Sequence, residues 1–226
     1  SGDVRHMKTY TLNSPEIQAL CDSDTRLALV IRHYGDLTYA IDIDPFTHII
    51  KNIIVQMLSR KAANAVVSRL YSLCNNVLTP FTIGRLDILA LRDIGISRHK
   101  AEYIMQMASL LREQPDYFKL LEFLSDEEII KRLTMLRGIG AWSAKMYLII
   151  VLDRPDILPY EDGAFLQVYK WLYATDDVKP TSVKERCAPW SPYSSIAARY
   201  MYRALDNGLM KDTKLNAKLA KMNSNL

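Results

Sequence analysis

A short glycine-containing segment carries the strongest indication of chemistry in this chain of 226 residues. Gly138, Ile139 and Gly140 lie between two stretches with helical periodicity, so they predict a tight turn with unobstructed backbone N–H groups. Such amides at the N-terminal end of a helix suit a phosphate, because they donate hydrogen bonds and the helix dipole favours negative charge. A carboxylate, Asp162, follows the second stretch after a loop that contains Pro159. A phosphate site with a carboxylate nearby points to chemistry on DNA.

Each of these features also has an ordinary structural explanation. Gly-x-Gly turns end helices in many proteins, and Asp162 stands before Gly163 where a helix N-cap is expected. For Asp162 the two explanations are compatible, since a capping aspartate stays ionised and oriented, as a base or a cation-stabilising group must be. Ser143 and Lys145 would add a hydroxyl and a positive charge to a phosphate site, or they are simply helix-start and solvent-facing residues.

Aromatic side chains near these features are candidate walls of a pocket: Trp142, Tyr160, Trp190 and Tyr193. An aromatic residue at helical spacing most often belongs to the core, and the same default applies to Met57 at the end of an apolar helix. Trp142 is the hardest of these to assign to the core, because it closely follows the turn, on the side of the helix where DNA would lie.

The elements that must position these residues are helices almost throughout. Capping residues and apolar periodicity predict helices at residues 26–34, 80–91, 98–111, 127–133, 141–151 and 163–173, a broken pair between 45 and 73, and further starts at Pro180 and Trp190. Only residues 9–12 and 38–43 resemble strands, and the lysine-bearing tail 211–226 is expected to fray. The sequence therefore predicts an all-α fold with no large β domain.

Composition is that of a soluble globular protein, with 49% hydrophobic and 24% charged residues. A net charge of +4 is compatible with a polyanionic partner but does not demonstrate one. Cys21, Cys74 and Cys187 lie far apart, which argues against a disulfide framework, a zinc site and an iron–sulfur cluster. No apolar run is long enough to span a membrane. We expect residues 1–6 to be an expression-tag remnant, and the protein to be a monomer in the cytoplasm, or in the nucleus of a eukaryote.

Together, these residues resemble the helix-hairpin-helix DNA glycosylases with a Gly/Pro-rich loop and an aspartate, most closely the 3-methyladenine DNA glycosylase II branch. The resemblance spans residues 44–206 and rests on segments in the same order: 54–59 with Ala62-Ala63, 94–97 with Lys100-Ala101, the hairpin with Asp162, and 190–197. It implies a two-lobed helical fold with the active-site cleft between the lobes. One lobe would be about 45–155, with the hairpin at 133–150, and the other 7–44 with 156–226.

The resemblance also implies roles for individual residues. Asp162 would be the catalytic carboxylate, and Met57 would fill the gap left by a flipped nucleotide. Trp142 and Tyr193 would hold the extruded base, with Tyr160 as a further candidate wall. The expected DNA-binding surface comprises Gly95, Arg137, Gly138, Ile139, Gly140, Ser143 and Lys145. Related hairpins hold Na⁺ or K⁺ through backbone carbonyls, which here would belong to Thr134, Leu136 and Ile139. Such an ion would be structural, and no cofactor is required.

One departure from the wider family decides the expected subclass. Relatives that also cut the DNA strand carry a lysine nucleophile where this chain has Trp142, and tryptophan cannot form a Schiff base. The expectation is therefore a monofunctional glycosylase that releases alkylated purines from double-stranded DNA. Two alternatives stay open: an oxidised-base glycosylase whose lyase activity uses Lys145 or another lysine, and a non-catalytic DNA-binding module. The motifs do not separate 3-methyladenine, 7-methylguanine, ethenoadenine and hypoxanthine as substrates.

Overall fold

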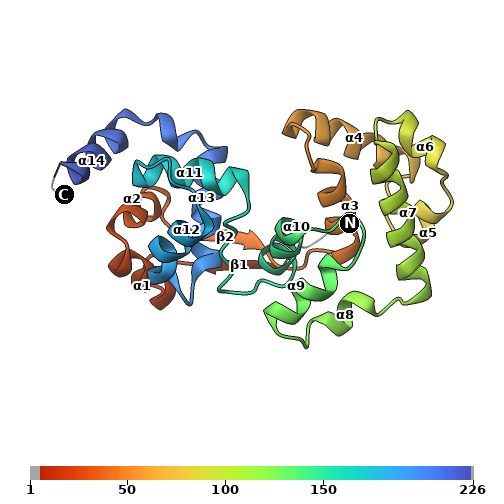
Figure 1. Cartoon of the computed structure of the whole chain (residues 1–226), viewed down its shortest axis with the longest axis horizontal. Helices are drawn as coiled ribbons and strands as arrows, with labels where there is room; N and C mark the ends of the chain where they lie inside the picture. Colours follow the sequence, from red (N-terminus) through yellow and green to blue (C-terminus); the bar gives the residue numbers. More distant parts are fainter. Residues whose placement is uncertain (1–5, 225–226) are drawn as a thin grey trace. The chain divides into compact units, whose positions relative to one another are not determined.

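The computed structural model describes residues 6–224, which are mainly helical (Figure 1). The predicted all-α class is confirmed, and within the described residues the only sheet has two strands. Residues 1–5 of the expected tag remnant lie outside the described residues. The chain divides into two compact units. The terminal unit contains the residues up to Asp42 and those from Asp153 onward, and the central unit is Ile43–Leu152.

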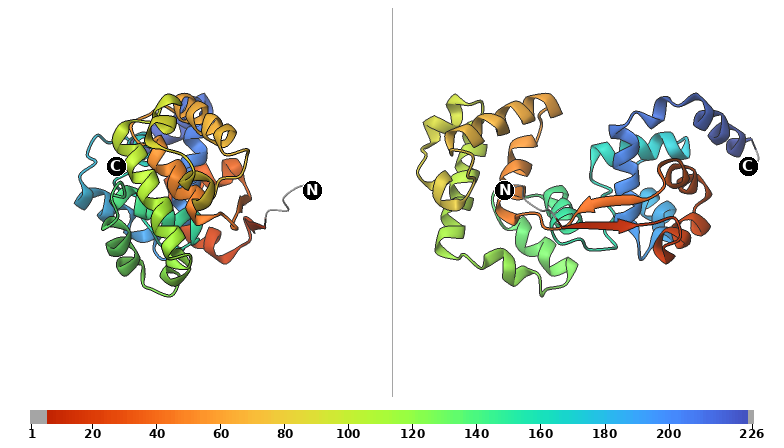
Figure 2. Two further views of the ribbon diagram at one scale, coloured as in Figure 1. Left: turned by 90° about the vertical axis from the view of Figure 1, so that its right-hand side faces the viewer. Right: turned by 180° about the vertical axis from the view of Figure 1, so that it is seen from behind.

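The terminal unit draws its elements from both ends of the chain. Its sheet pairs β1 (Met7–Tyr10) with β2 (Leu37–Ala40) in antiparallel register, with Tyr10 opposite Leu37 (Figure 2). Both strands overlap the segments that the sequence marked as weakly strand-like. The helices are α1 (Pro15–Ser23), α2 (Thr25–Tyr34), α11 (Gly163–Tyr173), α12 (Pro180–Cys187), α13 (Ser194–Asp206) and α14 (Thr213–Asn223), with short 3-10 turns at Ala188–Trp190 and Leu209–Lys211.

Aromatic side chains fill the core of the terminal unit. Phe165 of α11, Tyr200 of α13 and Trp190 are all fully buried. The Trp190 indole Nε1 donates to Asp24 Oδ2 at 2.8 Å, while Asp24 Oδ1 caps α2 by accepting from the backbone N–H of Leu27 at 2.9 Å. Because none of its surface is exposed, Trp190 is a core residue, the default for an aromatic at helical spacing, and not a pocket wall.

The C-terminal tail is more ordered than its composition suggested. Instead of fraying, it forms α14, whose start is capped by Asp212, which accepts from the backbone N–H of Leu215 at 2.8 Å. Leu215 and Leu219 are buried against the core of the terminal unit. The Trp171 indole N–H also donates to Asn216 Oδ1 at 2.7 Å, so α14 is held by apolar contacts and by a hydrogen bond to α11.

The central unit contains the hairpin and the helices around it. The broken pair predicted between residues 45 and 73 is two helices, and Ser59 caps the second by accepting from the backbone N–H of Ala62 at 3.2 Å. In contrast, the single helix predicted at 80–91 is two short helices, because Asp87 caps a new start. The helices are α3 (Pro45–Val55), α4 (Arg60–Leu73), α5 (Pro80–Gly84), α6 (Ile88–Asp93), α7 (Arg98–Glu113), α8 (Tyr117–Leu121), α9 (Asp126–Thr134) and α10 (Ala141–Met146).

The helix after the hairpin changes its winding halfway along. Residues 141–151 are helical as predicted, but α10 gives way to a π-helical turn at Tyr147–Val151. The wider turn is closed by the Leu152 N–H, which donates to the Tyr147 carbonyl at 3.2 Å. Tyr147 and Leu148 of this turn are completely buried, so the π-helical segment belongs to the core of the central unit.

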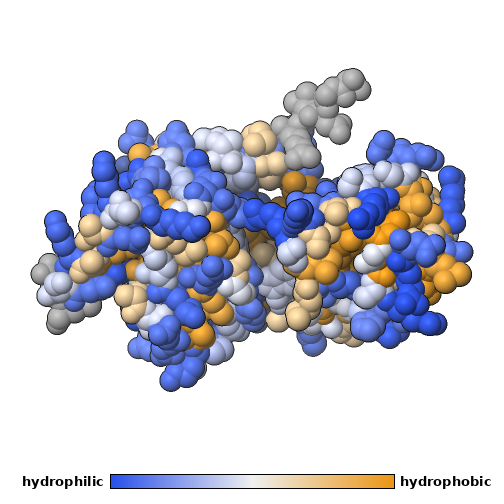
Figure 3. All heavy atoms as spheres, turned by 90° about the horizontal axis from the view of Figure 1, so that it is seen from above, coloured by the Kyte–Doolittle hydropathy of each residue, from blue (hydrophilic) through white to orange (hydrophobic). Residues whose placement is uncertain are grey.

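The surface of the chain is mixed in character. Figure 3 shows apolar residues, in orange, reaching the surface among hydrophilic residues on the face that it views. In the central unit the most exposed apolar side chains include Leu89, Phe123 and Met57. No helix within residues 6–224 is long and apolar enough to cross a membrane.

Candidate functional site

The predicted hairpin is a tight turn between α9 and α10. The Leu136 N–H donates to the Leu133 carbonyl at 3.0 Å, and the Ile139 N–H donates to the Leu136 carbonyl at 3.2 Å. Gly140 is the N-cap residue of α10 and has no side chain to satisfy the first amides of that helix. The turn therefore leaves backbone donors at a helix start, as a phosphate site requires.

The two glycines of the turn are needed for different reasons. Gly138 has a φ of +88°, and a Cβ placed on it would stand 2.7 Å from the ring of Tyr103. Gly140 has an ordinary φ of −99°, and a Cβ there would meet nothing within 4 Å. Gly138 is thus required by the backbone and by packing, whereas Gly140 faces open space. The open side of the hairpin is at Gly140.

Helix α7 supports the hairpin through Tyr103. The Tyr103 ring lies against Gly138, and the Arg137 guanidinium carbon lies 5.5 Å from the ring centroid. Arg137 is exposed and Ile139 is buried. Of the residues expected to touch DNA around the turn, Arg137 is the one that places a positive charge at the surface.

Two polar residues of α10 lie in the interior rather than at the surface. Ser143 is 1% exposed, and its hydroxyl accepts a hydrogen bond from Gln56 Nε2 at 3.3 Å. Lys145 is only 9% exposed. Its interpretation as a solvent-facing residue was wrong, and the structure does not place either side chain on the outer surface of the hairpin. The expected phosphate site would therefore consist of the backbone amides and Arg137.

Met57 occupies an exposed turn between α3 and α4. Its side chain is 100% exposed, and its φ of +62° is in the left-handed region. That conformation costs a residue with a Cβ about 1–2 kcal/mol, so the surrounding hydrogen bonds must hold it. The structure therefore excludes the core as the location of Met57 and presents it as a projecting apolar side chain.

The remaining expected DNA contact, Gly95, lies in the turn before α7. Its φ of +104° explains why glycine stands there. Arg69 Nη1 donates to the carbonyl of the neighbouring Ile94 at 3.0 Å. Gly95 and Ser97 are exposed, so this turn is accessible at the surface of the central unit.

The carboxylate of Asp162 is buried at the start of α11 in the terminal unit. It is 8% exposed, and Oδ1 accepts from the backbone N–H of Ala164 at 3.2 Å. The Tyr202 hydroxyl donates a second hydrogen bond to this carboxylate. Burial, and then the charge of Asp162, raise the pKa of Tyr202 well above its usual value, so the hydroxyl stays protonated as the donor. Asp162 is thus held by a cap and by a tyrosine.

Tyr202 was not among the residues singled out from the sequence. It lies on α13, and its contact with α11 arises from the packing of two helices far apart in the chain. Within Arg199–Arg203 two tyrosines alternate with other residues, and neither is marked by a cap, a turn or a charge pair. Only the fold distinguishes Tyr202 from Tyr200, whose hydroxyl donates to the Gly35 carbonyl at 2.7 Å.

The candidate base-pocket residues are partly buried aromatics. Tyr160 and Tyr193 belong to the terminal unit, and Lys184 Nζ lies 4.5 Å from the centre of the Tyr160 ring. Trp142 belongs to the central unit, and its buried indole N–H has no hydrogen-bond partner within the described part of the chain. A buried donor without a partner is suited to a ligand that accepts a hydrogen bond.

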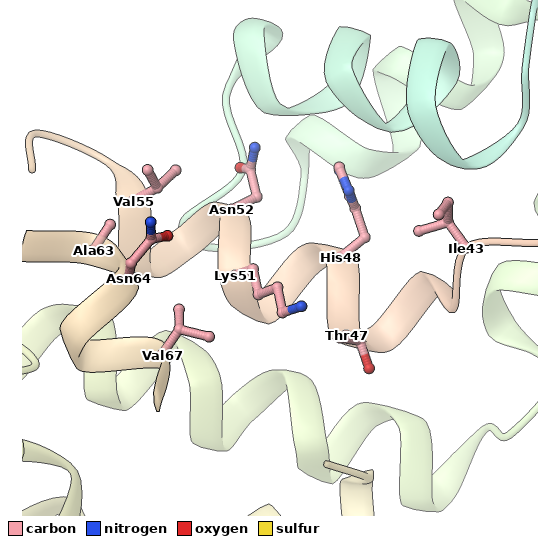
Figure 4. Close-up of a pocket in the computed structure, with 9 residues that line it drawn as sticks. All are labelled: Ile43, Thr47, His48, Lys51, Asn52, Val55, Ala63, Asn64 and Val67. Carbon is pink, nitrogen blue, oxygen red and sulfur yellow. The ribbon is translucent and has the colours of Figure 1, made fainter. Parts of the chain in front are cut away.

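A pocket of about 370 Å³ lies along α3 and α4 (Figure 4). Burial lowers the pKa of His48 to about 4, so its imidazole is neutral at physiological pH. His48 Nε2 and Asn52 Oδ1 are buried and have no partner among residues 6–224. The sequence did not single out this pocket, which is lined by Ile43, Thr47, His48, Lys51, Asn52, Val55, Ala63, Asn64 and Val67.

The cation expected at the hairpin would use main-chain oxygens. Among the described residues, no cluster of His, Cys, Asp and Glu is arranged to hold a metal ion. The Leu136 carbonyl already accepts the Ile139 N–H, and a carbonyl has a second lone pair for another partner. The donor set of Thr134, Leu136 and Ile139 is therefore compatible with a monovalent ion, which stays a prediction.

Comparisons with known proteins identify the family. Residues 50–192 match the model of HhH-GPD superfamily base excision DNA repair proteins. The chain is 30% identical to DNA-3-methyladenine glycosylase 1 of Schizosaccharomyces pombe over 199 residues, which cover 83% of this chain and 84% of that protein.

Solved structures agree with this assignment. The crystal structure of a DNA-3-methyladenine glycosidase from Bacillus halodurans superposes with a TM-score of 0.76 at 29% identity, covering 90% of this chain and 95% of that one. The 3-methyladenine DNA glycosylase of S. pombe in complex with abasic DNA gives a TM-score of 0.75 at 28% identity, covering 84% of this chain and 95% of that one. These findings confirm the resemblance seen in the sequence. The chain belongs to the HhH-GPD superfamily of base excision DNA repair proteins.

Proposed function

We propose that the protein is a monofunctional DNA glycosylase that releases alkylated purine bases from double-stranded DNA. The observation that carries the proposal is the buried Asp162 carboxylate, which is oriented by the Ala164 N–H and the Tyr202 hydroxyl. The names of the relatives, which are 3-methyladenine glycosylases at about 30% identity, support the same class of substrate.

DNA binding would begin at the hairpin of the central unit. The amides beside Gly140 hold a phosphate, and the exposed Arg137 adds positive charge. Rotating the target base out of the duplex costs a few kcal/mol, least for a damaged base. The fully exposed Met57 would fill the vacated stack.

Recognition of the lesion would depend on charge. An alkylated purine carries positive charge on its ring, and the face of an aromatic side chain attracts a cation with about 0.5–2 kcal/mol. Trp142 and Tyr193 are the proposed aromatic walls, with Tyr160 beside them. A positively charged base also leaves readily without prior protonation, so this mechanism needs no general acid.

Asp162 would act on the sugar. As the N-glycosidic bond breaks, positive charge develops on the deoxyribose, and a fixed carboxylate stabilises that charge. The same carboxylate can orient or deprotonate the attacking water. Trp142 supports hydrolysis without strand cleavage, since it provides no amine at the position of the lyase nucleophile.

The test is base release from a methylated duplex, measured by chromatography of the free bases. Wild-type protein should release 3-methyladenine, and Asp162→Asn should lose release while still binding the duplex in a gel-shift assay. Asp212→Asn is the matched control, because Asp212 also caps a helix of the terminal unit. Binding without release by the wild-type protein would instead identify a DNA-binding module, and strand nicking without added base would identify a lyase.

A further inference from the structure

The turn that presents Met57 is tied to two other parts of the central unit. On one side, Gln56 Nε2 donates to the Gly138 carbonyl at 3.0 Å and to Ser143 Oγ at 3.3 Å, so the turn is bonded to the hairpin. On the other side, Lys100 Nζ from α7 donates to the carbonyl of Ile54 at 2.9 Å and also to the carbonyl of Gln56. These bonds join the hairpin, the Met57 turn and α7 into one network.

Lys100 is suited to this position by its charge. Its partners are carbonyls at the end of α3, where the unpaired C=O groups give a helix a partial negative charge. A lysine there satisfies acceptors that the helix itself cannot, and it bonds on both sides of the point where the chain leaves α3. Burial lowers the pKa of the Lys100 ammonium, so part of its hydration has been exchanged for these carbonyls.

The backbone of Met57 needs such support. The carbonyl of Gln56 is the group immediately before Met57, whose φ of +62° is unfavourable for any residue with a Cβ. Within the turn itself, the Leu58 N–H donates to the Val55 carbonyl at 3.0 Å. Without Lys100 the turn would keep that bond and the Gln56 side chain, but the peptide that sets the direction of Met57 would lose its charged donor.

We propose that Lys100 is a positioning residue for DNA recognition, which fixes Met57 at a set position relative to the Gly138–Gly140 hairpin through the carbonyls of Ile54 and Gln56. The proposal rests on the proposed role of Met57 as the residue that fills the gap in the DNA. Lys100 acts through the protein backbone and makes no direct contact with the DNA in this account.

The first experiment compares affinities for two duplexes, one unmodified and one with a tetrahydrofuran abasic site that leaves a gap. Met57→Ala should reduce the preference for the abasic duplex by about 10-fold, because the gap is no longer filled. Lys100→Met should cause a similar loss and should slow single-turnover base release by about 10- to 100-fold. Lys119→Met, at an exposed lysine of α8, is the matched control and should change neither quantity.

Two further readouts separate positioning from general damage. Lys100→Arg keeps a charged donor and should recover part of the abasic preference. In the double variant of Lys100→Met with Met57→Ala, the loss of abasic preference should equal that of Met57→Ala alone, since both changes remove the same function, the filling of the gap by Met57. Thermal unfolding of each variant checks that the protein is folded.

The outcomes distinguish the positioning role of Lys100 from the gap-filling role of Met57 on which it rests. If Met57→Ala keeps the abasic preference, the gap-filling role of Met57 is wrong and the role of Lys100 falls with it, while base release by the wild-type protein would still stand. If Met57→Ala loses the preference but Lys100→Met retains it, or if the two losses add, Lys100 does not act through Met57. A fall of about 1 in the salt dependence of binding to the unmodified duplex would show that Lys100 contacts a phosphate, which also overturns the proposal.

Discussion

The hydroxyl of Tyr202 donates a hydrogen bond to the Asp162 carboxylate. The two residues lie on different helices of the terminal unit, Asp162 at the start of α11 and Tyr202 within α13. The helix cap sets the position of the carboxylate, and the tyrosine satisfies it from a second direction. A carboxylate held in this way stays in place when charge develops next to it, which is the requirement for electrostatic stabilisation.

Removing the Tyr202 hydroxyl should therefore slow the chemical step. In Tyr202→Phe the ring is retained and one hydrogen bond to a charged group is lost, typically worth about 1.5–3 kcal/mol. We expect single-turnover base release to slow by about 10-fold or more, with duplex affinity unchanged. Tyr200→Phe, which removes a hydroxyl from the same helix, is the control and should keep the wild-type rate. Equal rates for the two variants would show that Tyr202 does not position Asp162.

Alanine should affect protein stability at one hairpin glycine and DNA binding at the other. Gly138→Ala places a Cβ against Tyr103 at a positive φ, so we expect it to destabilise the fold by about 1–3 kcal/mol. Gly140→Ala has no such conflict and should leave the unfolding temperature unchanged while it weakens binding to every duplex, because the methyl group stands where a phosphate approaches. Thermal unfolding and fluorescence anisotropy measure the two effects. Unchanged binding by Gly140→Ala would rule out phosphate contact at this turn.

His48 should make stability depend on pH. Its pKa is about 4 in the folded protein, whereas an unperturbed histidine has a pKa of about 6.5, so between these values the unfolded chain binds more protons. The free energy of unfolding is therefore highest above about pH 6.5. It falls by an amount on the order of 3 kcal/mol as the pH falls towards 4, because the unfolded chain then gains a proton that the folded protein does not bind. Urea unfolding at several pH values should show a smaller acid loss for His48→Gln than for the wild type. His99→Gln, at an exposed histidine, should leave the pH dependence as it is in the wild type.

Borohydride should trap no covalent adduct between the wild-type protein and its DNA substrate. Trapping requires a Schiff base between an amine and the sugar, and Trp142 has no amine to offer. Lys145 is buried. A denaturing gel of the reaction, run beside a strand-cleaving glycosylase as the positive control, gives the answer. A trapped band from the wild-type protein would contradict the monofunctional assignment.

Local signals in the sequence located the parts of the site that depend on local structure. The hairpin follows from helical periodicity on both sides of Gly138 and Gly140, and the position of Asp162 follows from the rules of helix capping. Such features depend on residues within one or two turns, so a single sequence contains them. The change to π-helical winding at Tyr147 was not foreseen, because it depends on how the apolar residues of that segment pack.

Features that depend on packing between distant segments could not be obtained in this way. Lys145 is of a residue type that is usually exposed, yet the fold buries it. Trp190 lies in a motif near a helix start, yet its indole N–H donates a hydrogen bond to Asp24 in a distant segment. The same holds for Tyr202, whose partner lies on another helix. For Trp190 and Tyr202 the partner lies in a remote part of the chain, which periodicity does not report.

The division of the terminal unit between the two ends of the chain has a consequence for synthesis on the ribosome. Residues Ile43–Leu152 are continuous in the chain, whereas the core that covers the apolar faces of α1 and α2 includes residues of α11 and α13. At about 5–20 residues per second, the later segment takes several seconds to appear. During that interval the faces that carry Leu20, Leu27 and Ile31, which are buried in the folded protein, lack those partners. These two helices are thus made well before the partners that bury them, and we expect the nascent chain to be most prone to aggregation at that stage.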